Sequence, residues 1–157
     1  MLRYMTFGII SIALSSPTHS DATPLYSIGQ EVSLSSCITA SVVDVQRSST
    51  VELRGNWTAK PDEGSFVTVR VGVTPQCATG VVDWHNWNQS LDTWDGRDRI
   101  LYSLSPVLEL QGDNDAFCGE KGKRSIRTLV FDIGKTVKYL GVYLRPGREE
   151  KGVYITF

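Results

Sequence analysis

One stretch of the chain concentrates side chains that are suited to binding a ligand. Residues 81–98 contain three of the four tryptophans, four aspartates, three amides and one histidine. An indole stacks on the apolar face of a sugar ring, while Asp, Asn, Gln and Arg side chains hydrogen-bond the hydroxyls. Trp and Arg are also enriched at the centres of protein interfaces. The predicted ligand-binding residues are Trp84, His85, Trp87, Asp92, Trp94, Asp95, Arg97 and Asp98.

The aspartates of this stretch are also candidate ligands of a hard cation. Calcium takes several oxygen ligands from carboxylates, carbonyls and amides, so Asp92, Asp95 and Asp98 are the candidate calcium ligands. Their spacing matches no EF-hand loop. Aspartate is common in turns, and a turn is the favoured interpretation. No other cofactor is predicted.

Few residues of the chain are suited to catalysis. A Ser–His–Asp or Cys–His arrangement would have to use His85, the only histidine beyond residue 20. The sequence contains no Gly-x-Ser-x-Gly motif, and a zinc hydrolase usually draws several ligands from histidine. No catalytic residue is predicted, and a binding module is favoured over an enzyme. A small secreted hydrolase using Asp83 and His85 is kept as an alternative.

The amino terminus predicts export. Arg3 precedes an apolar run from Phe7 to Leu14, and small polar residues follow as far as Ser20. This order is typical of a secretory signal peptide, and the run is shorter than the roughly 20 residues of a membrane-spanning helix. We expect residues 1–20 to be a signal peptide and residues 21–157 to be a single β-rich domain, secreted or periplasmic. No later segment is apolar enough to predict a transmembrane helix.

The charge balance does not favour a nucleic-acid binder. The chain has 16 basic and 17 acidic residues, and removal of Arg3 with the signal peptide gives 15 − 17 = −2. The distribution is uneven, because residues 81–118 hold two basic and seven acidic residues, whereas residues 119–157 hold nine basic and four acidic ones. The simpler interpretation of this uneven distribution is that the charges lie on solvated loops. The more specific interpretation is an acidic binding surface beside a basic one.

Three cysteines are candidates for a disulfide. An oxidising compartment favours a bridge, and three thiols allow one bridge with one thiol left over. Cys77 and Cys118 each lie in a turn-rich stretch beside a predicted strand, so we predict that they pair. Cys37 is then the odd cysteine, through which the chain could form an oligomer.

Strands must position these residues, because the hydrophobic pattern has a period of two. Residues 66–73 are the clearest case, with four valines on one face. In the strand predicted over 137–144, Lys138 shares a face with Leu140, Val142 and Leu144. Residues 81–98 are predicted to form a long loop or a strand–loop–strand rather than a core strand. Further strands are predicted over 30–35, 38–46, 50–57, 79–84, 99–104, 106–111, 127–133 and 153–157.

The whole pattern predicts an all-β fold. No window has the pattern of an amphipathic helix of normal length, and 14 glycines and six prolines punctuate the chain. We expect a single antiparallel β-sandwich, jelly-roll-like, or a small barrel of about 8–10 short strands. The predicted function is an exported binding module that recognises a carbohydrate or cell-surface ligand through the Trp/Asp-rich loop. The first alternative is a secreted protein-interaction component, such as an inhibitor, a toxin subunit or an envelope assembly protein.

Overall fold

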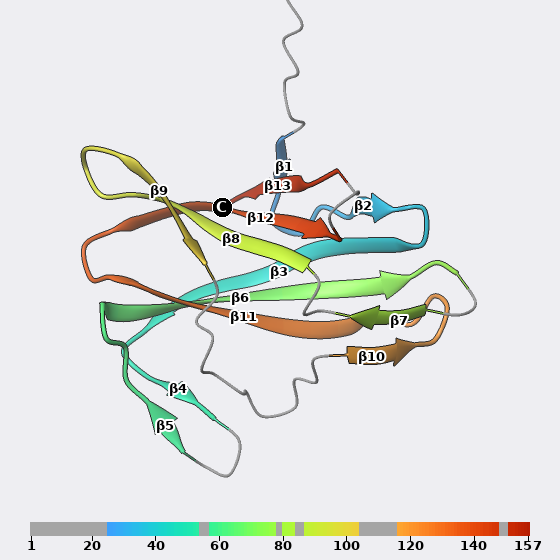
Figure 1. Ribbon diagram of the computed structural model, residues 1–157, viewed down its shortest axis with the longest axis horizontal. Helices are drawn as coiled ribbons and strands as arrows, with labels where there is room; N and C mark the ends of the chain where they lie inside the picture. Colours follow the sequence, from blue (N-terminus) through green and yellow to red (C-terminus); the bar gives the residue numbers. More distant parts are fainter. Residues whose placement is uncertain (1–24, 54–56, 78–79, 84–86, 104–115, 148–150) are drawn as a thin grey trace, which may run out of the picture.

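The computed structural model describes residues 25–53, 57–77, 80–83, 87–103, 116–147 and 151–157 (Figure 1). The predicted signal peptide lies outside these ranges, as do Trp84, His85 and the strand predicted over 106–111. The described ranges contain thirteen strands: β1 (Leu25–Ser27), β2 (Val32–Ser35), β3 (Ile38–Ser48), β4 (Val51–Glu52), β5 (Thr58–Ala59), β6 (Gly64–Pro75), β7 (Gly80–Asp83), β8 (Trp87–Trp94), β9 (Arg99–Ser103), β10 (Ala116–Gly119), β11 (Ser125–Gly134), β12 (Lys138–Pro146) and β13 (Val153–Thr156).

The strands form a β-sandwich. A five-stranded sheet has the order β1-β13-β12-β8-β9, and a four-stranded sheet has the order β11-β6-β3-β2 (Figure 1). The pairs β10–β7 and β4–β5 form two small sheets. Every pairing in the described chain is antiparallel except that of β1 with β13. The all-β sandwich predicted from the sequence is therefore confirmed. None of the described residues forms a helix that could cross a membrane.

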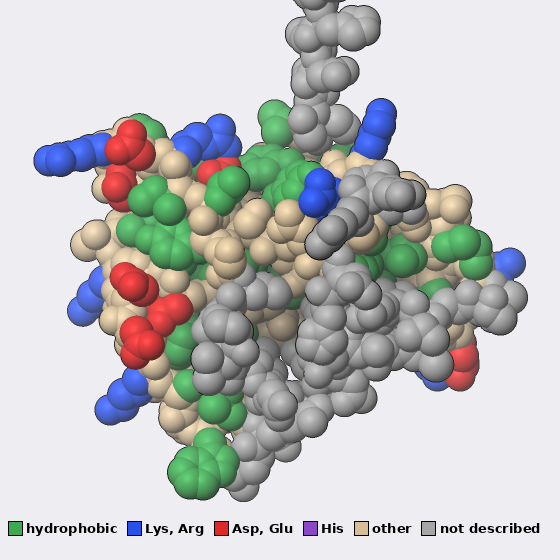
Figure 2. Space-filling model, viewed as in Figure 1, with side chains coloured by type: hydrophobic (Ala, Val, Ile, Leu, Met, Phe, Trp, Pro, Cys, Tyr) green, Lys and Arg blue, Asp and Glu red, His purple; other side chains and the backbone are tan. Residues whose placement is uncertain are grey.

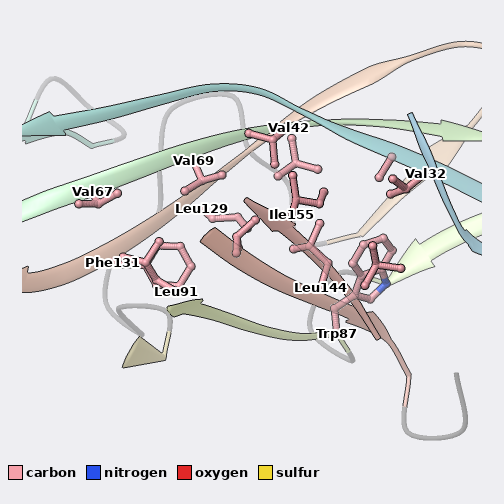
Figure 3. Close-up of a cluster of buried hydrophobic side chains, with 14 of the residues drawn as sticks. Val32, Val42, Val67, Val69, Trp87, Leu91, Leu129, Phe131, Leu144 and Ile155 are labelled. Atoms are coloured by element: carbon pink, nitrogen blue, oxygen red, sulfur yellow. The ribbon is translucent and has the colours of Figure 1, made fainter. Parts of the chain in front are cut away.

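The core lies between the two large sheets. The four valines of β6 share its inner face because side chains alternate along a strand, and all four are buried. Residues of β8, β12 and β13 face them from the opposite sheet, with Trp87, Leu91, Leu144 and Ile155 pointing into the space between the sheets (Figure 3). A smaller cluster forms where the β4–β5 hairpin covers Phe66 and Val130.

Two predicted elements differ from the structure. Residues 50–57 were predicted as one strand, but β4 and β5 are two short strands whose turn is closed by a 2.7 Å hydrogen bond from Leu53 N to Trp57 O. Residues 81–98 are not a long loop, because β8 lies inside the five-stranded sheet between β12 and β9. The expectation that this stretch contains no core strand is wrong, because β8 carries Trp87 and Leu91 into the core. Polar Gln89 and Thr93 occupy inner positions of β8 and weaken its hydrophobic alternation.

The predicted pairing of Cys77 with Cys118 is wrong. The disulfide joins Cys37 to Cys77, with 5.0 Å between their Cα atoms. Cys37 precedes β3 and Cys77 follows β6, and these two strands pair antiparallel, so the two cysteines meet at one end of the sheet. Gln76 N also donates a 2.7 Å hydrogen bond to Cys37 O. The third cysteine, Cys118, lies on β10, opposite Val81 of β7.

Arg47 holds the start of β12 against the four-stranded sheet. Its guanidinium extends from β3 and donates hydrogen bonds to Ser65 Oγ at 2.9 Å, to Lys135 O at 2.8 Å and to Val137 O. It also lies over the Tyr139 ring, 5.4 Å from the ring centroid. The β11–β12 turn is thereby fixed, and with it the position from which Lys138 begins β12.

Candidate ligand-binding face

The side of the five-stranded sheet that points away from the core presents the most concentrated group of chemically suitable side chains. We call this side the outer face. Trp94 and Asp92 lie on it because they alternate with Leu91, which points into the core. In Figure 2, hydrophobic side chains are exposed over the upper, five-stranded sheet, and charged side chains surround the β8–β9 turn at the left. The face therefore combines apolar surface with charge.

Strand register arranges the outer face in rows, because directly opposite residues of paired strands lie on the same face. Neighbouring strands are about 4.8 Å apart, so members of a row lie side by side. The first row is Lys138, Trp94 and Arg99; the second is Gly141, Asp92 and Leu101; the third is Tyr154, Tyr143 and Ser90.

Trp94 is the exposed tryptophan of this face. Its side chain is 38% exposed, and its two cross-strand neighbours are Arg99 on β9 and Lys138 on β12. Both cations are exposed. An indole flanked by two cations offers a flat apolar surface together with hydrogen-bond donors on either side.

Asp92 fixes one of these cations. Its carboxylate is only 2% exposed and accepts hydrogen bonds from Arg99 Nε at 3.2 Å, from Arg99 Nη2 and from Tyr154 Oη at 2.6 Å. The Arg99 side chain is 63% exposed. Its third nitrogen, Nη1, makes no hydrogen bond with any residue in the described ranges. Asp92 therefore holds the guanidinium in one orientation and leaves three of its five N–H groups unused by this carboxylate.

Glycines allow the tyrosines to lie flat over the sheet. Gly141 separates Asp92 on β8 from Thr156 on β13, and a Cβ atom added there would be 2.7 Å from Tyr154 Oη. The Tyr154 ring can cross β12 and reach Asp92 only because Gly141 has no side chain. Tyr143 lies over Gly152 in the same way.

The cluster shifts the pKa values of its members. Burial alone would raise the pKa of Asp92, but the hydrogen bonds from Arg99 and Tyr154 and the positive charge of Arg99 outweigh it and lower the pKa below 3.8. Burial, the hydrogen bond to Asp92 and its negative charge raise the pKa of Tyr154 from 10.0 to about 12. The folded state therefore favours the Asp92 carboxylate and the neutral Tyr154 phenol.

We predict that Asp92→Asn lowers the free energy of unfolding by about 2 kcal/mol near neutral pH, because charge-assisted hydrogen bonds are lost. A carboxyl whose pKa is lowered by folding stabilises the protein above its unfolded value of 3.8 and loses this contribution as the pH falls further. The difference between wild type and variant should therefore shrink below about pH 4. Urea unfolding at about pH 7 and about pH 3 measures it, and a pH-independent difference would contradict the prediction.

The residues predicted from the sequence are only partly brought together. Trp87 and Trp94 lie at opposite ends of β8 and on opposite faces, and Trp87 is 8% exposed in the core. Asp95 Oδ1 accepts hydrogen bonds from Arg97 N at 2.7 Å and Asp98 N at 2.8 Å, and these bonds lower the pKa of Asp95. The segment from Asp95 to Asp98 is therefore a turn whose side chains are exposed.

The predicted calcium ligands do not converge. Within the described ranges, no group of three His, Cys, Asp or Glu side chains is arranged to hold a metal ion. The Asp92 carboxylate is bound by Arg99 and Tyr154, and the Asp95 carboxylate closes the turn. Its role in the turn explains why an aspartate occupies position 95.

Sequence reasoning missed the residues contributed by β9, β12 and β13. Tyr143 and Tyr154 occupy the positions that alternate with buried Leu144 and Ile155, so the period-two pattern already placed them on an outer face. Lys138 was assigned to the wrong side. A β-bulge between Tyr139 and Gly141 shifts the register, so Lys138 lies opposite Trp94 on the outer face, although Val142 and Leu144 point inward.

No family model and no curated protein matches the sequence. Three solved structures have a similar fold. An uncharacterised β-sandwich protein from Clostridium difficile has a TM-score of 0.56 at 10% identity, over 86% of this chain and 95% of its own. The secreted protein MPT63 from Mycobacterium tuberculosis has a TM-score of 0.54 at 13% identity, over 88% of this chain and 100% of its own. A conserved hypothetical protein from Bacillus anthracis has a TM-score of 0.51 at 15% identity, over 82% of this chain and 94% of its own. At these identities the likeness shows the fold alone.

Proposed function

We propose that the protein is an exported binding module that recognises a carbohydrate on the outer face of the five-stranded sheet. The observation that carries the proposal is the exposed Trp94 indole beside Arg99, whose guanidinium is held by buried Asp92. The proposed site thus moves from the loop expected from the sequence to a sheet face. Trp94 and Arg99 lie on paired strands, so their separation is set by the sheet.

The rigidity of this face supports sugar recognition. A sugar presents one apolar ring face and a rim of hydroxyls, so it is bound best by a flat aromatic surface beside fixed hydrogen-bond donors and acceptors. Groups that are already fixed before binding lose little conformational entropy when the ligand arrives. Asp92 and Tyr154 supply this fixation for Arg99, and Ser90 offers a hydroxyl in the third row.

The disulfide supports an extracytoplasmic location. Disulfides persist in oxidising compartments and are rare in the cytosol, so the Cys37–Cys77 bridge agrees with the signal peptide predicted over residues 1–20. We therefore propose that the mature domain acts outside the cell or in the periplasm, where glycans of cell surfaces are accessible.

We predict that Trp94→Ala weakens carbohydrate binding at least about tenfold, because truncation of a central tryptophan typically costs more than ~1 kcal/mol. The matched control is Trp57→Ala. Trp57 is 73% exposed on the β4–β5 hairpin, away from the five-stranded sheet (Figure 1). A glycan array followed by calorimetric titration of the best ligand measures both variants. Equal binding by Trp94→Ala and wild type, or no glycan binding by wild type, would contradict the proposal.

A further inference from the structure

We propose that the sugar recognised at Trp94 carries a carboxylate, as a uronic acid does, and that Lys138 binds this group at one edge of the indole while Arg99 lies at the other edge. This inference rests on the proposed function and specifies the chemical class of its ligand.

The first observation is the composition of the row that contains Trp94. Lys138 and Arg99 are the direct cross-strand partners of Trp94 on its two neighbouring strands. Each is about one strand spacing, roughly 4.8 Å, from the tryptophan along the row. A sugar ring stacked on the indole would therefore have a cation near each of two edges.

The second observation is the charge of the whole outer face. Its described strand positions carry three cations, Lys138, Arg99 and Arg145, and one acid, Asp92. The Asp92 carboxylate is already saturated by Arg99 and Tyr154, so it does not repel an arriving anion strongly. Arg145 Nε is buried and has no hydrogen-bond partner among the described residues. The strand positions of the face thus carry more cations than acids, although the chain has a formal charge of −1 and the adjoining turn exposes Asp95, Arg97 and Asp98.

The third observation is the number of donors that each cation offers. Arg99 uses its Nε–H and one N–H of Nη2 on Asp92, so three of its five N–H groups are not used by this carboxylate, and Lys138 offers an ammonium group with three N–H donors. The ammonium at one edge of the indole suits a small anionic group attached directly to the stacked ring, and the guanidinium at the other edge suits the ring hydroxyls. The carboxylate of a uronic acid is bonded to a ring carbon, whereas a sulfate ester lies one oxygen further from the ring.

The test compares acidic oligosaccharides with their neutral methyl esters. Hexasaccharides of galacturonate, mannuronate and hyaluronan, their methyl-esterified forms and a sulfated galactan hexasaccharide are titrated by calorimetry. We expect at least one uronate to bind about tenfold more tightly than its ester, and the preference to fall as the salt concentration rises.

Two lysine variants locate the charge effect. Lys138→Gln should weaken uronate binding about threefold and thereby lower the preference for the uronate over its methyl ester. Lys121→Gln is the matched control, because Lys121 is exposed in the β10–β11 loop at the other end of the molecule (Figure 1). It should change neither affinity.

The outcomes separate the two proposals. Equal, Trp94-dependent affinity for acids and esters would overturn the carboxylate inference and leave carbohydrate binding intact. Tightest binding of the sulfated galactan, or no effect of Lys138→Gln on the uronate, would also overturn it. Binding of no saccharide in the panel or on the glycan array would overturn the proposed function and the inference together.

Discussion

Removal of the Cys37–Cys77 disulfide is expected to lower the free energy of unfolding by about 4 kcal/mol. The bridge closes a loop with a sequence separation of 40 residues, and the chain-entropy model assigns about this value to a loop of that length. The double variant Cys37→Ser/Cys77→Ser keeps similar side-chain volumes, so the lost cross-link dominates the change. Urea unfolding of wild type and variant, followed by circular dichroism, measures the difference.

Cys118→Ser is the control for this experiment. The Cys37–Cys77 bridge is intact in this variant, so its midpoint of unfolding should fall far less than that of the double variant. Peptide mapping under non-reducing conditions should recover Cys37 linked to Cys77. A bridge involving Cys118, or a loss of stability in Cys118→Ser as large as in the double variant, would contradict the structure.

Replacement of Gly141 by alanine is expected to lower the free energy of unfolding by about 3 kcal/mol. The added Cβ would lie 2.5 Å from Ile155 O and 2.7 Å from the Tyr154 ring. Ile155 O belongs to the backbone of β13, which is paired with β12, so it cannot move without disturbing the sheet. Overpacking of this kind costs about 1–3 kcal/mol, and displacement of Tyr154 also weakens its hydrogen bond to Asp92.

Gly134→Ala provides the comparison. A Cβ at Gly134 would be 3.0 Å from a methyl group of Val137, a side chain rather than backbone, so the loss of stability should be clearly smaller. Chemical unfolding of both variants measures the difference. If Gly141→Ala is no less stable than Gly134→Ala, the close approach of Tyr154 to the backbone of β12 is not as described.

Gly141→Ala also tests how the outer face is organised. Tyr154 reaches Asp92 across Gly141, and Asp92 holds Arg99. If this chain of contacts positions Arg99 for a ligand, the variant should bind carbohydrate more weakly even at temperatures where it is fully folded. Unchanged affinity in the folded variant would show that Arg99 does not need this support.

Local alternation was sufficient to predict the fold class. The valines at residues 67, 69, 71 and 73 face the core because side-chain direction alternates along any strand. The sequence has no helical period and has frequent turn residues, and these two features excluded the fold classes that contain helices. Trp87 shows the limit of composition as evidence, because an indole suits both a binding site and a hydrophobic core. Trp87 lies in the core because β8 pairs with β12 and β9 inside the five-stranded sheet.

Pairings between distant parts of the chain were not predictable in the same way. Cys37 and Cys77 meet because β3 and β6 pair over their whole length, and spacing along the chain carries no information about that register. The strand assigned to residues 50–57 became a hairpin because it could cover Phe66 and Val130, two outward-facing residues of other strands.

The sequence by itself determined that the chain forms a sandwich of short strands, and it predicted a ligand site built from tryptophan and charged side chains. The tertiary structure decided which of those side chains meet. Lys138 and Gly141 are three residues apart, so strict alternation would put them on opposite faces, but the bulge between Tyr139 and Gly141 puts both on the outer face. Register and bulges depend on contacts between strands far apart in sequence, and these contacts alone bring Lys138, Trp94 and Arg99 into one row.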